Sequence, residues 1–269
     1  MKPCGIITLL TDFGLEDGYV GIVKGVILGI NPSARIVDIS HLIPHGSILD
    51  AALVLQEAWH FFPEGTVHLA IVDPGVGTSR RPLALEVSNH CFVGPDNGLF
   101  RPIIDQYPSS KIVHLNKSQY FLPEISNTFH GRDIFAPVAA HLSSGIALHL
   151  LGSPVSDPVS LPIPAPEIEK NLLRGEVIRV DHFGNLITNI DAKTLKDFIG
   201  KNQPLVQIGS LRISGITSTY GEVAPGEAVA LIGSAGLLEI AVNLGHASDM
   251  DGLGAKKGLG IAVTVTRMG

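Results

Sequence analysis

The stretch VHLAIVDPGVGTSR, residues 67–80, decides the fold of this chain. An apolar run ends abruptly in the carboxylate Asp73, a loop with two glycines follows, and Arg80 lies seven residues beyond the aspartate. In an open α/β sheet, a buried strand delivers a polar side chain to its carboxyl end, and glycines let the backbone approach a ligand. The segment therefore predicts an α/β sheet with a reactive site at the end of this strand.

Strand-like and helix-like patterns alternate through the first half of the chain. Apolar residues at helical spacing predict helices over residues 19–30, 48–61 and 133–142. This alternation predicts a Rossmann-like α/β domain with a mostly parallel sheet and helices on its faces. The expected strands are residues 6–10, 35–39, 67–72, 83–87, 91–93 and 112–115.

The character of the sequence changes at SPVSDPVSLPIPAP, residues 153–166. Its five prolines predict an extended linker, over about residues 153–170. We expect the α/β domain over residues 1–155 and a small β-barrel domain over residues 171–269, because short strand patterns separated by Gly or Asn turns follow. The expected elements are strands at 176–180, 186–190, 205–208, 228–232, 237–242 and 260–266 and one helix at 192–199.

Composition restricts the class of protein. The 269 residues are 45% hydrophobic and 16% charged with a formal net charge of −6, which predicts a large core and no nucleic-acid partner. Two cysteines, Cys4 and Cys91, are typical of a reduced cytoplasmic protein and too few for a disulfide framework. No apolar run reaches the ~18 residues of a membrane helix, so we expect no membrane partner.

Polar residues beside glycines are the first candidates for chemistry. Asp12 ends the first expected strand and could accept both hydroxyls of a ribose, or it could cap the turn before the next helix. Asp73 and Arg80 could form an ion pair that only staples their loop, and His130 could be structural. Together, however, these three residues supply an acid, a cation and a base within glycine-rich segments.

The segment DHFGN, residues 181–185, lies between two expected strands of the second domain. It is either a hairpin loop or a pocket for a planar base, with Phe183 for stacking and Asn185 for hydrogen bonds to the base edge. Metal-binding residue types also recur, but none has the short spacing of a zinc motif, so we expect no catalytic metal. These residues are Asp12, His41, Asp73, His130 and Asp133.

An ordered series of motifs covers nearly the whole chain and resembles the S-adenosyl-L-methionine hydroxide adenosyltransferases, relatives of the fluorinase and chlorinase enzymes. The resemblance implies an N-terminal α/β domain, a C-terminal β-barrel, and a homotrimer with active sites between subunits. The motifs are T-D-F-G-x-x-D-x-Y-V-G (11–21), V-D-P-G-V-G-x-x-R (72–80), V-G-P-D-N-G (93–98), F-H-G-R-D-I-F-A-P (129–137), D-x-F-G-N-x-x-T-N (181–189) and S-x-G-x-L-E-I-A-V-N (234–243).

The same resemblance implies roles for individual residues. Asp73, Arg80 and His130 would form the set that activates water. Asp12 would hold the ribose hydroxyls. The remaining contacts would be Phe183 and Asn185 to adenine, with Tyr220 as a candidate stacking partner, and Asp17, Asp181 and Ser234 around the methionine end.

The implied reaction is attack of water on C5′ of S-adenosyl-L-methionine, which yields adenosine and L-methionine without a cofactor or a metal. A halogenase is the nearest alternative. A carboxylate about 4 Å from a halide costs roughly 4 kcal/mol at an effective dielectric constant near 20, and the halogenating relatives carry an uncharged residue in place of Asp73. We therefore expect a hydrolase.

Two further classes stay open. A sensor that only binds S-adenosyl-L-methionine would need Asp12, Phe183 and Asn185 but not the water-activating set. A metal-dependent phosphoesterase would lose activity with a chelator.

Overall fold

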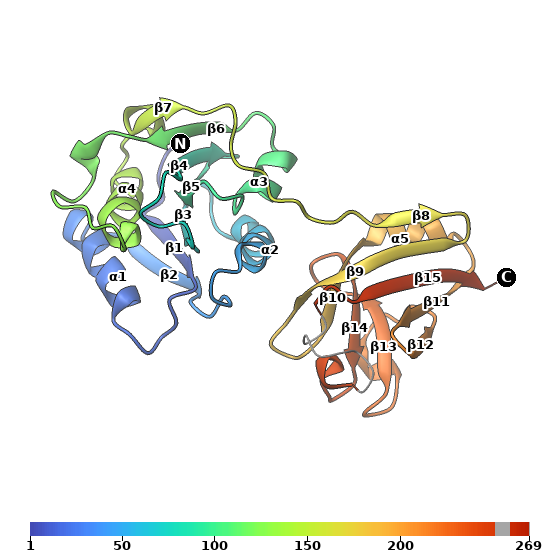
Figure 1. Cartoon of the computed structure of the whole chain (residues 1–269). Coiled ribbons are helices and arrows are strands. Elements are labelled where there is room, and N and C mark those ends of the chain that lie inside the picture. The colour runs from blue at the N-terminus through green and yellow to red at the C-terminus, as the bar shows by residue number, and fades with distance from the viewer. Residues whose placement is uncertain (251–258, 269) are drawn as a thin grey trace. The chain divides into compact units, whose positions relative to one another are not determined.

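The computed structural model describes residues 1–250 and 259–268, which fall into two compact units, Met1–Leu161 and Pro162–Gly269 (Figure 1). Each unit has its own hydrophobic core. Among the described helices, none is long and apolar enough to cross a membrane.

The first unit contains a seven-stranded sheet in the order β2-β1-β3-β5-β4-β6-β7. The pairs β1–β2, β1–β3 and β3–β5 are parallel, whereas β4–β5, β4–β6 and β6–β7 are antiparallel. The α/β class of this domain is confirmed, but the prediction of a mostly parallel sheet is wrong, because the sheet is mixed. Its strands are β1 (Ile6–Thr11), β2 (Arg35–Ser40), β3 (Val67–Ile71), β4 (Pro82–Val87), β5 (His90–Pro95), β6 (Lys111–Leu115) and β7 (Gly152–Pro154).

A tight turn between β4 and β5 explains the error. Val87 pairs with His90, and the two residues between them, Ser88 and Asn89, have φ angles of 45° and 63°. Positive φ at both central residues is the conformation of a two-residue hairpin turn. Such a turn reverses the chain, whereas a parallel pair needs a crossover of a dozen or more residues. Buried apolar runs look the same in either strand direction, so periodicity could not separate the two arrangements.

Helices cover both faces of this sheet (Figure 1). Side chains alternate along β3, so that Leu69 packs in the core under α1 and α4, and Ala70 packs in the core under α2 and α3. A three-layer α/β unit results. The helices are α1 (Tyr19–Ile30), α2 (Ile48–Ala58), α3 (Arg101–Gln106) and α4 (Ala136–Ser143), with short turns η1 (Trp59–Phe61), η2 (Ser118–Tyr120), η3 (Gly131–Phe135) and η4 (Leu148–Leu150).

The predicted helices at 19–30 and 48–61 are confirmed as α1 and as α2 followed by η1. The helix predicted at 133–142 corresponds to α4, which begins at Ala136. The π-helical turn η3 precedes it, so helical structure already begins at Gly131. The six residues of α3 are too few to show helical periodicity, so this helix was not predicted.

The second unit is an eight-stranded antiparallel sheet in the order β12-β11-β15-β9-β10-β14-β13, with β8 added beside β9. Thr217, three residues after the end of β12, forms an isolated bridge with Leu231 of β13, so the sheet curves into a nearly closed barrel. Its strands are β8 (Glu167–Glu169), β9 (Leu172–Val180), β10 (Leu186–Asp191), β11 (Gln203–Ile208), β12 (Leu211–Ser214), β13 (Ala228–Ile232), β14 (Leu237–Val242) and β15 (Ala262–Met268).

The helix predicted at 192–199 is confirmed as α5 (Ala192–Ile199). Asp191 caps it by accepting a hydrogen bond from the Thr194 backbone N–H, and Leu195 and Phe198 enter the core of the second unit. The short turns η5 (Tyr220–Glu222) and η6 (Ala247–Asp249) complete this unit.

Candidate active site

Two carboxylates of the first unit lie where the order of its strands switches. From β1 the chain crosses to β2 on one side and then to β3 on the other, and Thr11 at the end of β1 pairs with Ile71 at the end of β3. Asp12 and Asp73 follow these two strand ends. Open α/β sheets bind ligands outside the carboxyl ends of their strands at such a switch point, so the topology places both carboxylates at the expected ligand edge.

Arg80 is held on three sides. Its Nε lies 2.9 Å from both carboxylate oxygens of Asp73, and its Nη2 donates to Asp73 Oδ2. The same Nη2 lies 2.9 Å from His130 Nδ1, and the guanidinium carbon lies 5.1 Å from the centre of the Phe135 ring. The Arg80 and Asp73 side chains are only 9% and 6% exposed. The structure therefore brings together the three residues that the sequence predicted as one set.

The remaining nitrogen of this guanidinium, Nη1, is buried and makes no hydrogen bond within the described part of the chain. A buried donor without a partner costs roughly 1–3 kcal/mol, and more when it is charged. Native proteins satisfy nearly all such groups, so an exception calls for an explanation such as a ligand. Arg80 thus offers a fixed, positively charged donor for a bound molecule.

The hydrogen bond from Arg80 fixes the protonation of His130. Since the guanidinium can only donate, Nδ1 of His130 accepts, and the imidazole proton is on Nε2. Burial, followed by the charge of Arg80, lowers the pKa of His130 below its usual value. The imidazole is therefore neutral at pH 7.

Glycines allow these distant segments to meet. Gly77 has a φ of 75°, and a Cβ atom there would overlap the backbone oxygen of Asn127. A Cβ on Gly75 would lie 3.3 Å from Cγ of Arg80, so the loop folds closely over the arginine stem. The loop after β3 can consequently lie against the segment that carries His130.

Asp12 is held by the loop after β2. Its side chain is 8% exposed, and its Oδ2 accepts a hydrogen bond of 2.9 Å from the backbone N–H of Gly46 and lies 3.4 Å from His45 Nδ1. A Cβ on Gly46 would lie 3.9 Å from Cβ of Pro74, so this loop adjoins the one that carries Asp73. Asp17 is exposed in the turn before α1, and within the described residues no hydrogen bond or ion pair joins it to Asp12.

In the second unit, Asp181 shapes the loop that follows β9. Its Oδ1 accepts the backbone N–H groups of Phe183 and Asn185, and its Oδ2 accepts the Asn185 side-chain amide, all at 2.9 Å. One amide hydrogen of the buried Asn185 is thereby committed to Asp181. The Phe183 side chain is 68% exposed. The predicted hairpin or base-binding loop is thus a rigid turn that presents an aromatic ring.

Tyr220 and Ser234 also lie in this unit. The Tyr220 hydroxyl donates to Oε1 of the buried Glu239 at 2.7 Å, and burial together with this carboxylate raises the pKa of Tyr220 to about 12. The charge of Asp181 acts on Tyr220 in the same direction. Ser234 is exposed in the turn before β14, next to Gly233, where a Cβ atom would overlap Oε2 of Glu239.

Each unit therefore assembles its own part of the predicted site residues. Sequence reasoning missed the contacts made by single residues: Phe135 beneath Arg80, Gly46 on Asp12, and Glu239 on Tyr220. Phe135 and Glu239 lie within the quoted motifs, which was the available signal. Among the described residues, no three His, Cys, Asp or Glu side chains are arranged to hold a metal ion.

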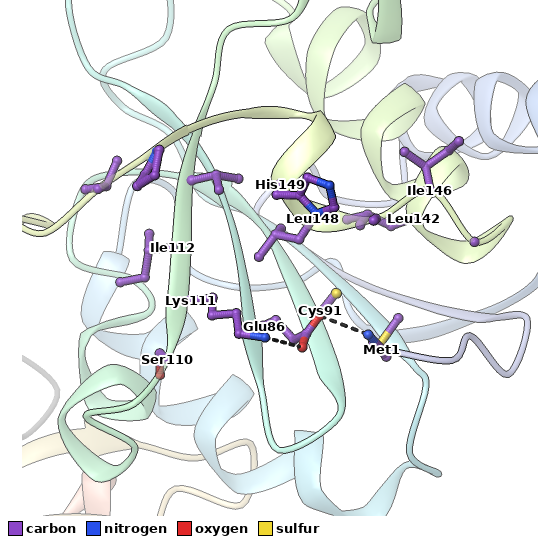
Figure 2. Close-up of a pocket in the computed structure, with 15 residues that line it drawn as sticks. Met1, Glu86, Cys91, Ser110, Lys111, Ile112, Leu142, Ile146, Leu148 and His149 are labelled. Carbon is purple, nitrogen blue, oxygen red and sulfur yellow. Dashed lines mark hydrogen bonds and ion pairs between the residues drawn. The ribbon is translucent and has the colours of Figure 1, made fainter.

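A cavity of about 530 Å³ lies elsewhere in the first unit (Figure 2). Cys91, on its wall, pairs with Val67 at the beginning of parallel strands β3 and β5, so the cavity is near the amino ends of these strands. The figure shows Glu86 on its wall, paired with Lys111 and with the amino group of Met1. Asp12, Asp73, Arg80 and His130 do not line it.

Comparison with known proteins supplies the family. Residues 7–152 match the SAM hydroxide adenosyltransferase N-terminal domain, and residues 175–259 match the C-terminal domain of the same family. A protein of Thermus thermophilus named (R)-S-adenosyl-L-methionine hydrolase is 41% identical over 268 residues, which cover 96% of this chain and 98% of that protein. A protein of Actinoplanes sp. named fluorinase is 28% identical over 298 residues, which cover 97% of each chain.

A solved structure agrees. The crystal structure of an uncharacterized conserved protein from Thermotoga maritima superimposes with a TM-score of 0.89 at 39% identity, covering 97% of this chain and 100% of that one. The motifs, the two domain matches and this structural similarity lead to one conclusion: the chain belongs to the SAM hydroxide adenosyltransferase family.

Proposed function

We propose that this protein hydrolyses S-adenosyl-L-methionine to adenosine and L-methionine by attack of water on C5′ of the ribose. Membership of the family and the names of relatives at 36–41% identity support the substrate and the reaction. The observation within the molecule that carries the proposal is the buried, unpartnered Nη1 of Arg80.

The chemistry demands such a donor. The sulfonium leaves as a neutral thioether, so the leaving group needs no acid, and the difficulty lies with water, whose pKa is about 15.7. Arg80 stays protonated at any relevant pH, and its Nη1 can donate to the oxygen as hydroxide character develops. Because the guanidinium is already fixed by Asp73, His130 and Phe135, it does not reorganise during the reaction.

Asp73 and His130 have different tasks in this proposal. Asp73 Oδ1 accepts one hydrogen bond, from Nε of Arg80, and keeps a lone pair to orient the attacking water. His130 Nδ1 is occupied by Arg80 and its Nε2 carries the proton, so in this state His130 positions the arginine. The proton released on forming the C5′–OH bond passes to solvent. Protonation of His130 would break its bond to Arg80, so activity should fall at pH values below its lowered pKa.

The substrate contacts are proposed as follows. Asp12 accepts hydrogen bonds from the ribose hydroxyls. Phe183 stacks on adenine, and Asn185 hydrogen-bonds the edge of the base. Tyr220 adds a second aromatic surface. Asp17, Asp181 and Ser234 surround the methionine end. The relatives' names carry the descriptor (R), which must refer to the sulfur because the adenosyl and L-methionine groups fix the carbon centres. We extend this preference for the (R) sulfonium to the present chain.

Halogenation is disfavoured by charge. Fluorinases are less similar to this chain than the hydrolases are, and Asp73 places a carboxylate beside the proposed nucleophile. A halide at that position would be repelled, whereas a water molecule gains a hydrogen-bond acceptor.

The proposed assembly is a cytoplasmic homotrimer without a cofactor, in which active sites form between subunits. The family resemblance supports the trimer. The exposure of Phe183 and Tyr220 in the second unit is consistent with a site completed by a ligand and by another surface.

The test is incubation of the pure protein with each sulfonium epimer of S-adenosyl-L-methionine, with a chelator and excess chloride, followed by chromatography of the products. We expect adenosine and L-methionine from the (R) epimer. Asp73→Asn should lower kcat by about 10²–10³-fold while calorimetry still detects substrate binding. Chlorinated nucleoside, loss of activity with the chelator, or full activity of Asp73→Asn would each contradict the proposal.

A further inference from the structure

One of the buried histidines of the first unit, His41, contacts the segment that carries Asp12. The His41 side chain is 2% exposed, its Nδ1 lies 2.8 Å from Oγ1 of Thr11, and its Nε2 lies 3.1 Å from Oδ1 of Asp38. Lys24 on α1 in turn lies 2.6 Å from Oδ2 of Asp38. These contacts link the side chain of Lys24, through Asp38 and His41, to the buried hydroxyl of Thr11. Thr11 is the residue before Asp12.

His41 contacts the chain on both sides of Asp12. On one side, Thr11 Oγ1 accepts a hydrogen bond of 3.2 Å from the backbone N–H of Phe13 and also meets His41 Nδ1. On the other side, the backbone oxygen of His41 accepts a hydrogen bond of 2.8 Å from the N–H of Gly14. One residue thus holds both ends of the short segment 11–14, and Asp12 lies inside it.

The hydrogen atoms can be assigned from this arrangement. A lone pair on Nε2 facing the Asp38 carboxylate would be repelled, so the proton of a neutral His41 belongs on Nε2, which lies 3.1 Å from Asp38 Oδ1 without forming a hydrogen bond. Nδ1 is then an acceptor, and the Thr11 hydroxyl donates to it. That hydroxyl therefore has one orientation, in which a lone pair is left to accept the Phe13 N–H.

An irregularity in β2 accompanies this contact. Leu9 pairs with Asp38 and Leu10 pairs with Ser40, so Ile39 is an extra residue on β2. Such bulges turn side chains and are frequent next to active sites. Burial raises the pKa of Asp38, but the hydrogen bond from Lys24 and the close contact with His41 outweigh this effect and lower it, so the carboxylate facing the imidazole is ionised.

We propose that His41 is a positioning residue, which sets the orientation of the Asp12 carboxylate for a ribose through Thr11 and Gly14. This inference rests on the proposed function, because it takes the nucleoside end of S-adenosyl-L-methionine as the ligand of Asp12. His41 does not touch the reacting atoms. It acts on the affinity for the ribose and not on the activation of water by Asp73 and Arg80.

The molecule offers a matched control for the test. Thr8, on the same strand, makes the same kind of buried contact, with its Oγ1 2.8 Å from Nδ1 of His68. Thr8 pairs with Val37 and His68 in the middle of the sheet, and within the described residues it makes no hydrogen bond to residues 11–14. Thr8→Val therefore removes an equivalent hydrogen bond at the same cost in stability and leaves the Asp12 segment intact.

The experiment measures kcat and KM for S-adenosyl-L-methionine, Kd for adenosine, and Tm in four variants and the control. Thr11→Val and His41→Leu should each raise KM and the adenosine Kd about tenfold, because each variant removes hydrogen bonds that hold the segment carrying the charged Asp12. Thr11→Ser keeps the hydroxyl and His41→Asn keeps an acceptor near Nδ1, so both should restore most of the affinity. Thr8→Val should lower Tm alone.

The outcomes separate this inference from the proposed function. Unchanged KM and adenosine Kd in folded Thr11→Val and His41→Leu would overturn the inference while leaving hydrolysis established by the unmodified protein. Equal losses in Thr8→Val would also overturn it, because the effect would then be structural. If the unmodified protein binds adenosine but does not hydrolyse S-adenosyl-L-methionine, the proposed function fails, and the adenosine Kd values alone decide the role of His41.

Discussion

The two groups of candidate site residues differ in how completely the protein satisfies them. In the first unit, Asp73, Arg80 and His130 are packed and bonded to one another, and Nη1 of Arg80 is the buried donor left over. In the second unit, Phe183 is 68% exposed and Tyr220 is 42% exposed. In the proposed site, the groups that would stabilise developing charge are thus fixed before the substrate arrives, whereas the surfaces that would recognise it stay open.

Exposure in the second unit does not mean looseness. Asp181 fixes the backbone on both sides of Phe183, and the oxygen of Gly184 accepts a 2.9 Å hydrogen bond from the Ser248 N–H. The ring is therefore presented by a rigid loop, which reduces the entropy lost when a ligand covers it. Both groups are preorganised. They differ because the contacts that hold Arg80 also bury its side chain, whereas the contacts that hold the loop of Phe183 leave its ring exposed.

The largest expected effect comes from breaking the first group. Arg80→Lys keeps the positive charge but loses the planar fork that pairs with Asp73, and a lysine cannot also bond His130 and present a free donor. We expect kcat to fall by about 10²–10³-fold, as for the loss of an oxyanion-stabilising donor. KM should change little, because the residues proposed to recognise the substrate are others. Steady-state kinetics with the (R) sulfonium substrate gives both values.

The neighbouring arginine provides the control. Arg81 pairs with Asp96 and Asp157 and is not part of the proposed water-activating set. Arg81→Lys should therefore retain kcat. Comparable losses of kcat in both variants would mean that the loop as a whole, and not the Arg80 guanidinium, supports the reaction.

The sequence predicted what depends on local pattern. Apolar periodicity located α1 and α2 and most strands, and the run ending at Asp73 located the carboxyl edge. Apolar periodicity could not give the direction of β4 relative to β5, because that direction depends on the Ser88-Asn89 turn. The seven-residue spacing of Asp73 and Arg80 is local, but the contact of Arg80 with His130 spans 50 residues and depends on the close approach of Gly77 to Asn127.

Single side chains that act through tertiary contacts were the hardest to predict. His41 was noted only as a residue type that binds metals, since nothing in its neighbours shows that it meets Thr11, 30 residues away. In the sequence, Phe135 and Glu239 are ordinary apolar and acidic residues of an expected helix and an expected strand; the structure places Phe135 in η3 and Glu239 in β14. Their roles come from burial against a charged or polar group, which one-dimensional spacing does not encode.

A second prediction concerns the stability of the first unit in acid. Burial, followed by repulsion from His90, lowers the pKa of His68 from 6.5 to about 3. The folded state thus binds this proton less readily than the unfolded state, and the stability from neutral His68 is present above about pH 6.5 and lost as the pH falls. Lowering the pH from 6.5 to 5 should cost about 2 kcal/mol, at ~1.36 kcal/mol per pH unit.

Urea unfolding of the unmodified protein and of His68→Asn at pH 6.5 and pH 5 checks this value. The variant removes the titrating group and keeps an amide near Thr8, so its loss of stability between the two pH values should be smaller by about 2 kcal/mol. The same acid dependence in both proteins would assign the effect to other groups in the first unit, such as His90 or His141, whose pKa values burial also lowers.

The smallest expected effect comes from breaking the open surface of the second unit. Phe183→Ala removes the ring proposed to stack on adenine, and stacking of one base on an aromatic side chain is worth about 1–3 kcal/mol. We expect KM for S-adenosyl-L-methionine to rise about tenfold while kcat is retained. Tm should be unchanged, because a side chain that is 68% exposed contributes little to the core. Phe61→Ala, which truncates an 81% exposed ring of the first unit, should alter neither KM nor Tm. If Phe183→Ala instead lowered Tm with KM unchanged, its ring would serve packing, and the contrast between a finished catalytic group and an open recognition surface would be lost.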